Sequence, residues 1–103
     1  MPTGILGQAA PTAATLTTVY TVPATKTAVF NVSIVNRGPT TAAVRLAIAG
    51  TGTPTNAEYI EYDAIIPVNG VLERGGLVAQ AAENVVVYSS IAGISVSAYG
   101  YEE

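Results

Sequence analysis

Hydrophobic and polar residues alternate along most of this chain, in short runs that are separated by turn residues. In residues 27–36, Phe30, Val32 and Ile34 alternate with Asn31, Ser33 and Val35. A period of two places such side chains on the two faces of a β-strand. Similar runs occupy residues 15–22, 41–49, 59–66, 71–79, 85–90 and 94–101. The sequence therefore predicts about seven short strands.

Turn residues between these runs indicate how the strands are connected. Pro67-Val68-Asn69-Gly70 is a strong hairpin signal, and we expect the last two runs to pair across Ala92-Gly93. Gly75-Gly76 predicts a bulge in its strand. The longest loop spans residues 50–58, and no segment predicts a helix of ten residues. This pattern is typical of an antiparallel β-sandwich, either Ig-like or jelly-roll-like, over residues 15–103.

The alternation also predicts which side chains face the core. In residues 59–66, Ile60, Tyr62, Ala64 and Ile66 fall on one side and we expect them to face inward. Tyr59, Tyr99 and Tyr101 fall opposite the apolar faces. An exposed aromatic row of this kind could bind sugar or a protein partner. The alternatives are a second buried face or packing between subunits, and packing is the favoured interpretation.

Residues 1–14 differ from the rest, because they carry no charged side chain and contain Pro2, Gly4, Gly7 and Pro11. These residues oppose regular structure. One interpretation is a frayed terminus. The other is an extended N-terminal arm that docks Ile5 and Leu6 on a neighbouring subunit. At the other end, Glu102 and Glu103 are expected to form a solvated tail.

The amino-acid composition is unusual in its small number of charged residues. Half of the 103 residues are apolar but only 11% are charged, against about 25% in ordinary domains. This indicates that other protein covers part of the surface. The net charge is −3 and Lys and Arg form no run, so nucleic-acid binding by a basic patch is not expected. No apolar run is long enough to span a membrane, and no basic region precedes the first apolar residues.

The sequence offers little for catalysis. It contains no Cys and no His, so thiolate metal sites and the commonest general base are excluded. Ser89-Ser90 has no histidine to activate it, and Lys26 lies in an expected turn. Glu61 and Asp63 share a strand face and could bind a hard cation. The alternative is a solvated face on which they pair with Arg45 or Arg74. We expect no enzyme activity, no cofactor and no metal.

A resemblance to a known group of proteins covers almost the whole chain. It rests on GILGQ (residues 4–8), TLTTVYTVPATKTAVFNVSIVNRG (15–38), VRLAIA (44–49), EYIEYDAIIPVNGVLERGGLV (58–78) and SVSAYGYEE (95–103). These segments resemble a small virion structural protein of tailed bacteriophages, a module that also occurs inside tail, collar and fibre proteins. One departure is Pro23-Ala24-Thr25-Lys26, where that group more often has Gly after the Ala. The difference implies another turn within the same fold.

The resemblance implies a non-enzymatic virion protein that is made in the host bacterial cytoplasm. We expect an oligomeric capsid cement or decoration subunit, with a trimer as the favoured form, that binds the major capsid protein or another virion protein. Ile5 and Leu6 in the arm would be its anchors. The alternative is a tail, collar or fibre component. A further alternative, from another class, is a host-surface adhesin that binds glycans through Tyr59, Tyr99 or Tyr101.

Overall fold

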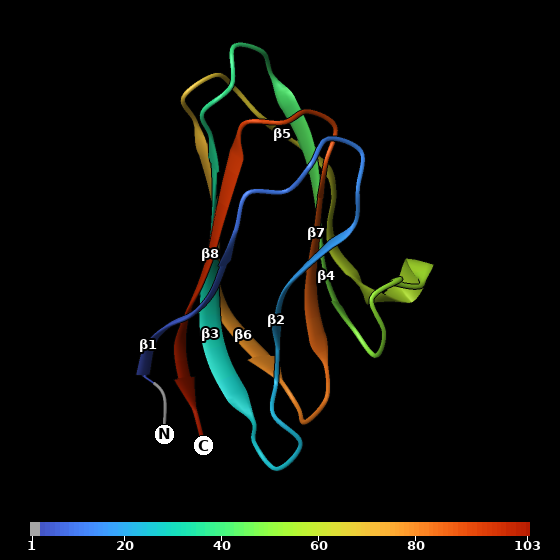
Figure 1. Ribbon diagram of the computed structural model, residues 1–103, viewed down its shortest axis with the longest axis vertical. Coiled ribbons are helices and arrows are strands. Elements are labelled where there is room, and N and C mark those ends of the chain that lie inside the picture. Colours follow the sequence, from blue (N-terminus) through green and yellow to red (C-terminus); the bar gives the residue numbers. More distant parts are fainter. Residues whose placement is uncertain (1–2) are drawn as a thin grey trace.

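Eight strands form two four-stranded antiparallel sheets that pack face to face in a computed structural model, which describes residues 3–103 (Figure 1). The strands are β1 (Thr3–Ala9), β2 (Thr17–Thr21), β3 (Ala28–Asn36), β4 (Ala42–Ala49), β5 (Tyr59–Ile66), β6 (Val71–Ala79), β7 (Asn84–Ser89) and β8 (Ile94–Glu102), with a short 3-10 helix, η1 (Asn56–Glu58), before β5. Sheet A has the order β1-β8-β3-β6, and sheet B has the order β2-β7-β4-β5. The predicted antiparallel β-sandwich is confirmed, with eight strands instead of about seven.

The strands pair in a nested order. β1 pairs with β8, β2 with β7, β3 with β6 and β4 with β5. The chain is therefore one long hairpin whose tip is the β4–β5 loop at residues 50–58. The hairpin is rolled up so that β3 also pairs with β8 and β4 with β7. This connectivity is that of a jelly roll, so the strand order decides between the two sandwich types that the sequence allowed.

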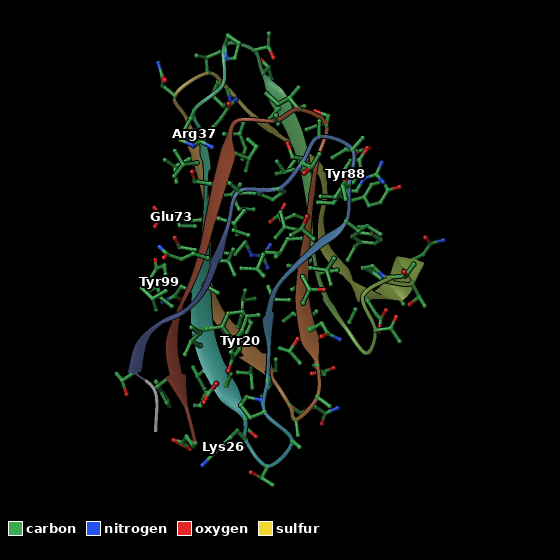
Figure 2. The ribbon with its side chains drawn as sticks, in the orientation of Figure 1. Tyr20, Lys26, Arg37, Glu73, Tyr88 and Tyr99 are labelled. Carbon is green, nitrogen blue, oxygen red and sulfur yellow. The ribbon has the colours of Figure 1, made fainter. Side chains whose placement is uncertain are left out.

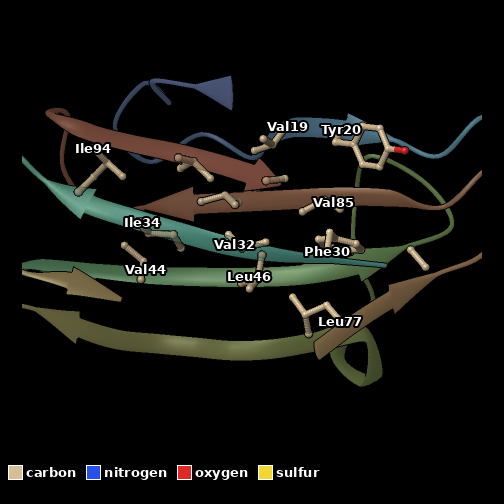
Figure 3. Close-up of a cluster of buried hydrophobic side chains, with 14 of the residues drawn as sticks. Val19, Tyr20, Phe30, Val32, Ile34, Val44, Leu46, Leu77, Val85 and Ile94 are labelled. Carbon is tan, nitrogen blue, oxygen red and sulfur yellow. The ribbon is translucent and has the colours of Figure 1, made fainter. Parts of the chain in front are cut away.

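The core lies between the two sheets and consists mainly of aliphatic side chains (Figure 3). Phe30, Val32 and Ile34 of β3 are almost completely buried, as their alternation predicted. Val44 and Leu46 of β4 meet them from sheet B. Each fully buried side chain of this kind stabilises the fold by roughly 1.5–3 kcal/mol. Burial on both sheets is therefore what holds the layers together.

Two predicted hairpins are wrong, although their turns are present. The amide of Gly70 donates to the Pro67 carbonyl at 2.8 Å, but β5 belongs to sheet B and β6 to sheet A. The turn around Gly93 likewise connects β7 in sheet B to β8 in sheet A. A turn signal reports only that the chain reverses direction. Each strand here pairs with its partner in the nested order and not with the strand that follows it. The chain therefore crosses from sheet B to sheet A at both turns.

The extended arm expected over residues 1–14 is not confirmed, because Thr3–Ala9 is the edge strand β1 and hydrogen-bonds to β8. The register shifts between Ile5 and Gly7, and Leu6 packs against the core while Ile5 is 58% exposed. A Cβ on Gly7 would lie 2.3 Å from the Val19 carbonyl oxygen. The glycine that suggested irregular structure instead allows β1 to approach β2 closely. Met1 and Pro2 lie outside the described residues.

Glu102 was expected in a solvated tail, but it is buried and connects the two sheets. Its carboxylate accepts a hydrogen bond from the Tyr20 hydroxyl. Tyr20 lies on β2 of sheet B and Glu102 on β8 of sheet A. Figure 2 shows Tyr20 directed into the lower part of the sandwich. Burial raises the pKa of the Tyr20 phenol, and the bond and charge of Glu102 raise it further.

This raised pKa predicts a loss of stability in alkaline solution. Unfolded tyrosine ionises near pH 10, whereas the folded protein keeps the Tyr20 phenol protonated to a higher pH. The stability that Tyr20 contributes is therefore complete below about pH 10 and decreases as the pH rises above it. Urea unfolding between about pH 8 and 11 should show a steeper decline for the wild type than for Tyr20→Phe. Equal slopes in the two proteins would contradict this assignment, since both retain the other five tyrosines.

Candidate functional sites: two exposed aromatic surfaces

Exposed apolar side chains gather on the outer face of sheet A. They lie at the end of the sandwich where β1 begins and β8 ends (Figure 1). In one row across the sheet, Tyr101 of β8 pairs with Val29 of β3, which pairs with Val78 of β6. In the next row Tyr99 pairs with Ile5 of β1. These five residues are called the sheet A patch. Val78 is 59% exposed and Tyr101 is 38% exposed.

The surroundings of the sheet A patch are polar but mostly uncharged. Its two rows are completed by Thr3 and Asn31. The following row contains Gln8, whose side-chain amide donates to Ser97 at 3.3 Å. Negative charge lies beyond both ends of the patch. Glu103 pairs with Thr27 in the row next to Tyr101. Glu73 lies in the row of Gln8, further along the sheet from Tyr99 (Figure 2). The five residues of the patch are therefore uncharged themselves, with one carboxylate beyond each end.

The structure brings together three of the five residues that the sequence singled out. Ile5, Tyr99 and Tyr101 lie side by side, because β1 pairs with β8. Leu6 points the other way and packs against the core, partly buried, so its role as an anchor stays a prediction while Ile5 is the exposed residue of the pair. Tyr59 lies on β5 in sheet B. The expected aromatic row of Tyr59, Tyr99 and Tyr101 is thus divided between the two layers.

A second aromatic surface lies on the outer face of sheet B. The Arg45 guanidinium carbon is 4.1 Å from the centre of the Tyr62 ring and 4.7 Å from that of Tyr88. Arg45 also donates to Asp63, with Nε 2.7 Å from Oδ1, and this bond raises the pKa of Arg45. Cation–π contacts and the ion pair therefore fix the arginine between two rings. Tyr88 and Tyr99 lie on opposite outer faces (Figure 2).

Tyr62 is 57% exposed, so its predicted place in the core is wrong. The pairing of β4 with β5 shifts between Val44 and Leu46 and again between Leu46 and Ala47. Asp63 has φ 54, the left-handed region that residues other than glycine rarely adopt. These irregularities interrupt the period of two and turn the Tyr62 ring outward. No local sequence signal marks them.

A pocket of about 420 Å³ lies beside this cluster and is lined by Asn56, Tyr59 and Tyr62. The rings of Tyr59 and Tyr62 have centres 5.0 Å apart and planes at 83°. Asn56 begins η1, at the tip of the long hairpin. We call these three residues the Tyr62 pocket. The sequence drew attention only to Tyr59. Asn56 comes close to it through the shape of the β4–β5 loop, and Tyr62 comes close to it because its ring turns outward.

The turn that carries Asn56 is held by Glu58. Its carboxylate accepts from the Thr55 amide at 2.7 Å and from the Gly50 amide at 3.2 Å. These backbone hydrogen bonds lower the pKa of Glu58. The loop expected as plain connecting chain is therefore fixed at both ends by one side chain, and it places Asn56 at the rim of the pocket.

The two carboxylates considered as cation ligands are each paired with an arginine. Asp63 accepts from Arg45, and Glu61 accepts from Arg74 of β6, as the alternative interpretation expected. Because β6 belongs to sheet A, the second pair joins the two layers at one edge. Within residues 3–103, no three acidic, His or Cys side chains come together as a metal site. The Ser89 hydroxyl is buried and donates to the Ile91 carbonyl at 2.8 Å.

Comparison with known proteins gives no relative. No protein-family model matches the chain, and neither a curated protein nor a solved structure matches it. In the part of the chain from Thr3 to Glu103, no helix is both long and apolar enough to cross a membrane. The fold, identified from its strand order, and the two aromatic surfaces are therefore the observations on which function can be argued.

Proposed function

We propose that this protein is a non-enzymatic structural protein of a bacteriophage virion, an oligomeric cement or decoration subunit that binds the assembled capsid. The observation that carries the proposal is the sheet A patch, an exposed apolar face in a protein with few charges. The resemblance of the sequence to phage virion proteins agrees with it. Jelly rolls occur in viral capsid domains and also in lectin domains, so the fold supports the proposal without deciding it.

The composition of the sheet A patch suits contact between subunits. Aromatic side chains are enriched at interface cores and charged ones are depleted there. Tyr99 and Tyr101 offer large apolar rings with hydroxyls at their edges, and Ile5 and Val78 add aliphatic surface on either side. The protein carries a net charge of −3, so a second copy is approached with less repulsion through a patch whose own side chains are uncharged. We therefore assign this face to association between copies.

On a capsid, several such copies would contact a repeating surface at once. Weak contacts then add as avidity, and a protein that binds the assembled shell and not its free parts stabilises the shell by mass action. A tail, collar or fibre position is the alternative within the same virion. It differs in copy number, since a shell offers many more equivalent sites than a tail does.

Deletion of residues 2–14 would not separate binding from folding, because it would remove β1. Val78→Asp is a cleaner variant, since its side chain is exposed in the monomer. A buried unpaired charge in the interface should weaken self-association by roughly 30-fold or more. The free energy of unfolding should change by less than about 0.5 kcal/mol. Sedimentation velocity over a range of concentrations measures the first effect and urea unfolding the second.

The matched control is Ile65→Asp, because Ile65 is 66% exposed but lies on β5 of sheet B. This variant should associate as the wild type does. The assignment of the interface to sheet A is wrong if Ile65→Asp and Val78→Asp associate equally well. A wild-type protein that stays monomeric at every concentration would contradict self-association itself.

A further inference from the structure

We propose that the Tyr62 pocket is a binding site for a neutral carbohydrate, in which a pyranose ring stacks in the corner made by Tyr59 and Tyr62. The inference does not depend on the virion proposal, because it concerns the opposite sheet and different residues. Of the three tyrosines that the sequence offered for glycan binding, only Tyr59 lines this pocket. Tyr99 and Tyr101 lie in the sheet A patch.

The geometry of the two rings suits a sugar. Their planes meet at 83° with centres 5.0 Å apart, so they form two walls of a corner and not a closed stack. The face of an aromatic ring carries partial negative charge. The C–H groups on the flat side of a pyranose carry partial positive charge, and they pack against such a face. In a corner, one tyrosine ring contacts the flat side of the pyranose and the other contacts its edge.

Polar groups at the rim can satisfy the hydroxyls of a sugar. The side-chain amide of Asn56 both donates and accepts, and so does each tyrosine hydroxyl. Asn56 is exposed at the start of η1, and the Glu58 contacts to Thr55 and Gly50 hold the turn that carries it. The volume of about 420 Å³ lies within the range of about 300–1,000 Å³ that small-ligand sites occupy.

The charges around the pocket favour an uncharged ligand. Arg45 is paired with Asp63, and Glu61 with Arg74. The remaining nearby charge is Glu58, and two backbone amides lower its pKa, so it is ionised at neutral pH. An anionic sugar would meet this negative charge without a free cation in the cluster to offset it. Neutral sugars avoid this repulsion.

Contacts within the protein also restrain the pocket before any ligand arrives. Tyr62 is held by the Arg45 guanidinium and by the edge contact with Tyr59 although more than half of it is exposed. The neighbouring Asp63 adopts φ 54, a conformation with a cost in free energy. Fixing the side chain in advance reduces the entropy lost on binding.

The test uses the full chain, ¹⁵N-labelled, in NMR titrations with methyl glucoside, lactose, maltose and cellobiose, after a screen on an array of neutral and sialylated glycans. We expect at least one neutral glycan to bind, with shifts at the Asn56 side-chain amide and at the backbone amides of Tyr59 and Tyr62. Tyr62→Ala should weaken that binding by about tenfold or more. The matched control is Ile65→Ala, which removes an exposed apolar side chain from the same strand outside the pocket and should leave the affinity unchanged.

Several outcomes overturn the proposal. One is the absence of any neutral-glycan binding on the array and up to about 20 mM in the titrations. Another is binding that Tyr62→Ala leaves intact, or shifts confined to Tyr99 and Tyr101. Preferential binding of sialylated glycans would overturn the assignment of a neutral ligand. None of these outcomes depends on whether the protein self-associates, so the two proposals fail independently.

Discussion

A Gly100→Ala variant is expected to lose most of its folding stability. Gly100 lies in β8 between β1 and β3, and a Cβ at this position would be 2.1 Å from the Val29 carbonyl oxygen and 2.7 Å from the Phe30 Cα. Both clashing atoms are backbone of β3, which is itself held by β6 on its other side. Neither strand can move without breaking a ladder of hydrogen bonds.

We expect the cost to be roughly 4 kcal/mol or more, because a fixed backbone cannot relax as a side chain does. Domains of this kind have a total stability of about 5–15 kcal/mol, so the variant should melt at a much lower temperature or remain unfolded. The matched control is Gly50→Ala, where nothing lies within 4 Å of the added Cβ. Thermal denaturation followed by circular dichroism compares them. A Gly100→Ala protein that melts like Gly50→Ala would show that the sheet A register is incorrect.

Asn36→Asp is expected to have the second largest effect. The Asn36 side chain is completely buried, and its amide nitrogen donates to the carbonyls of Thr40 at 2.9 Å and Ile66 at 3.0 Å. Its oxygen accepts from the Gly38 amide at 2.9 Å. This one side chain therefore ties the loop after β3 to the end of β5. An aspartate would place a carboxylate oxygen against two carbonyl oxygens.

The expected loss at pH 7 is about 3–5 kcal/mol, since two donors disappear and an unpaired charge is buried. Burial should raise the pKa of the new carboxyl. Its protonated form would be favoured in the folded state, so the deficit should shrink as the pH falls toward about 4. The control is Asn31→Asp, because the Asn31 oxygen only accepts, from the Gly76 amide at 3.2 Å. Urea unfolding at both pH values measures the deficit, and an equal one in the two variants would contradict this role for Asn36.

Much of the fold could be read from local alternation, since Phe30, Val32 and Ile34 have the period of a half-buried strand and are buried together. Alternation does not show which strands pair with each other. The turn at Pro67 and Gly70 has the same sequence signal whether the chain turns within one sheet or crosses to the other. The nested order is set by burial of all eight strands at once, which no single turn encodes. Gly7 was expected to oppose regular structure, but it lies in a strand. In sequence, a glycine that lets two strands approach closely looks the same as a glycine that breaks a strand.

The two sites differ in how far the sequence could reveal them. Alternation in the last strand identified Tyr99 and Tyr101 as outward-facing residues. Ile5 was identified as one of the few large apolar residues in residues 1–14. Val29 and Val78 were missed because their proximity to Tyr101 depends on the pairing of three strands. The Tyr62 pocket could not be found, because its key residue turns outward at irregularities in β5 that tertiary packing produces.

The most direct test of the virion proposal is the position and copy number of the chain on purified particles of the phage that encodes it. Electron cryomicroscopy, with quantitative mass spectrometry against the major capsid protein, gives both. We expect hundreds of copies in register with the shell, with Ile5, Val78 and Tyr101 buried between neighbouring copies. A small number at the neck or tail would move the protein to the alternative position. Absence of the chain from purified particles would contradict the proposed function.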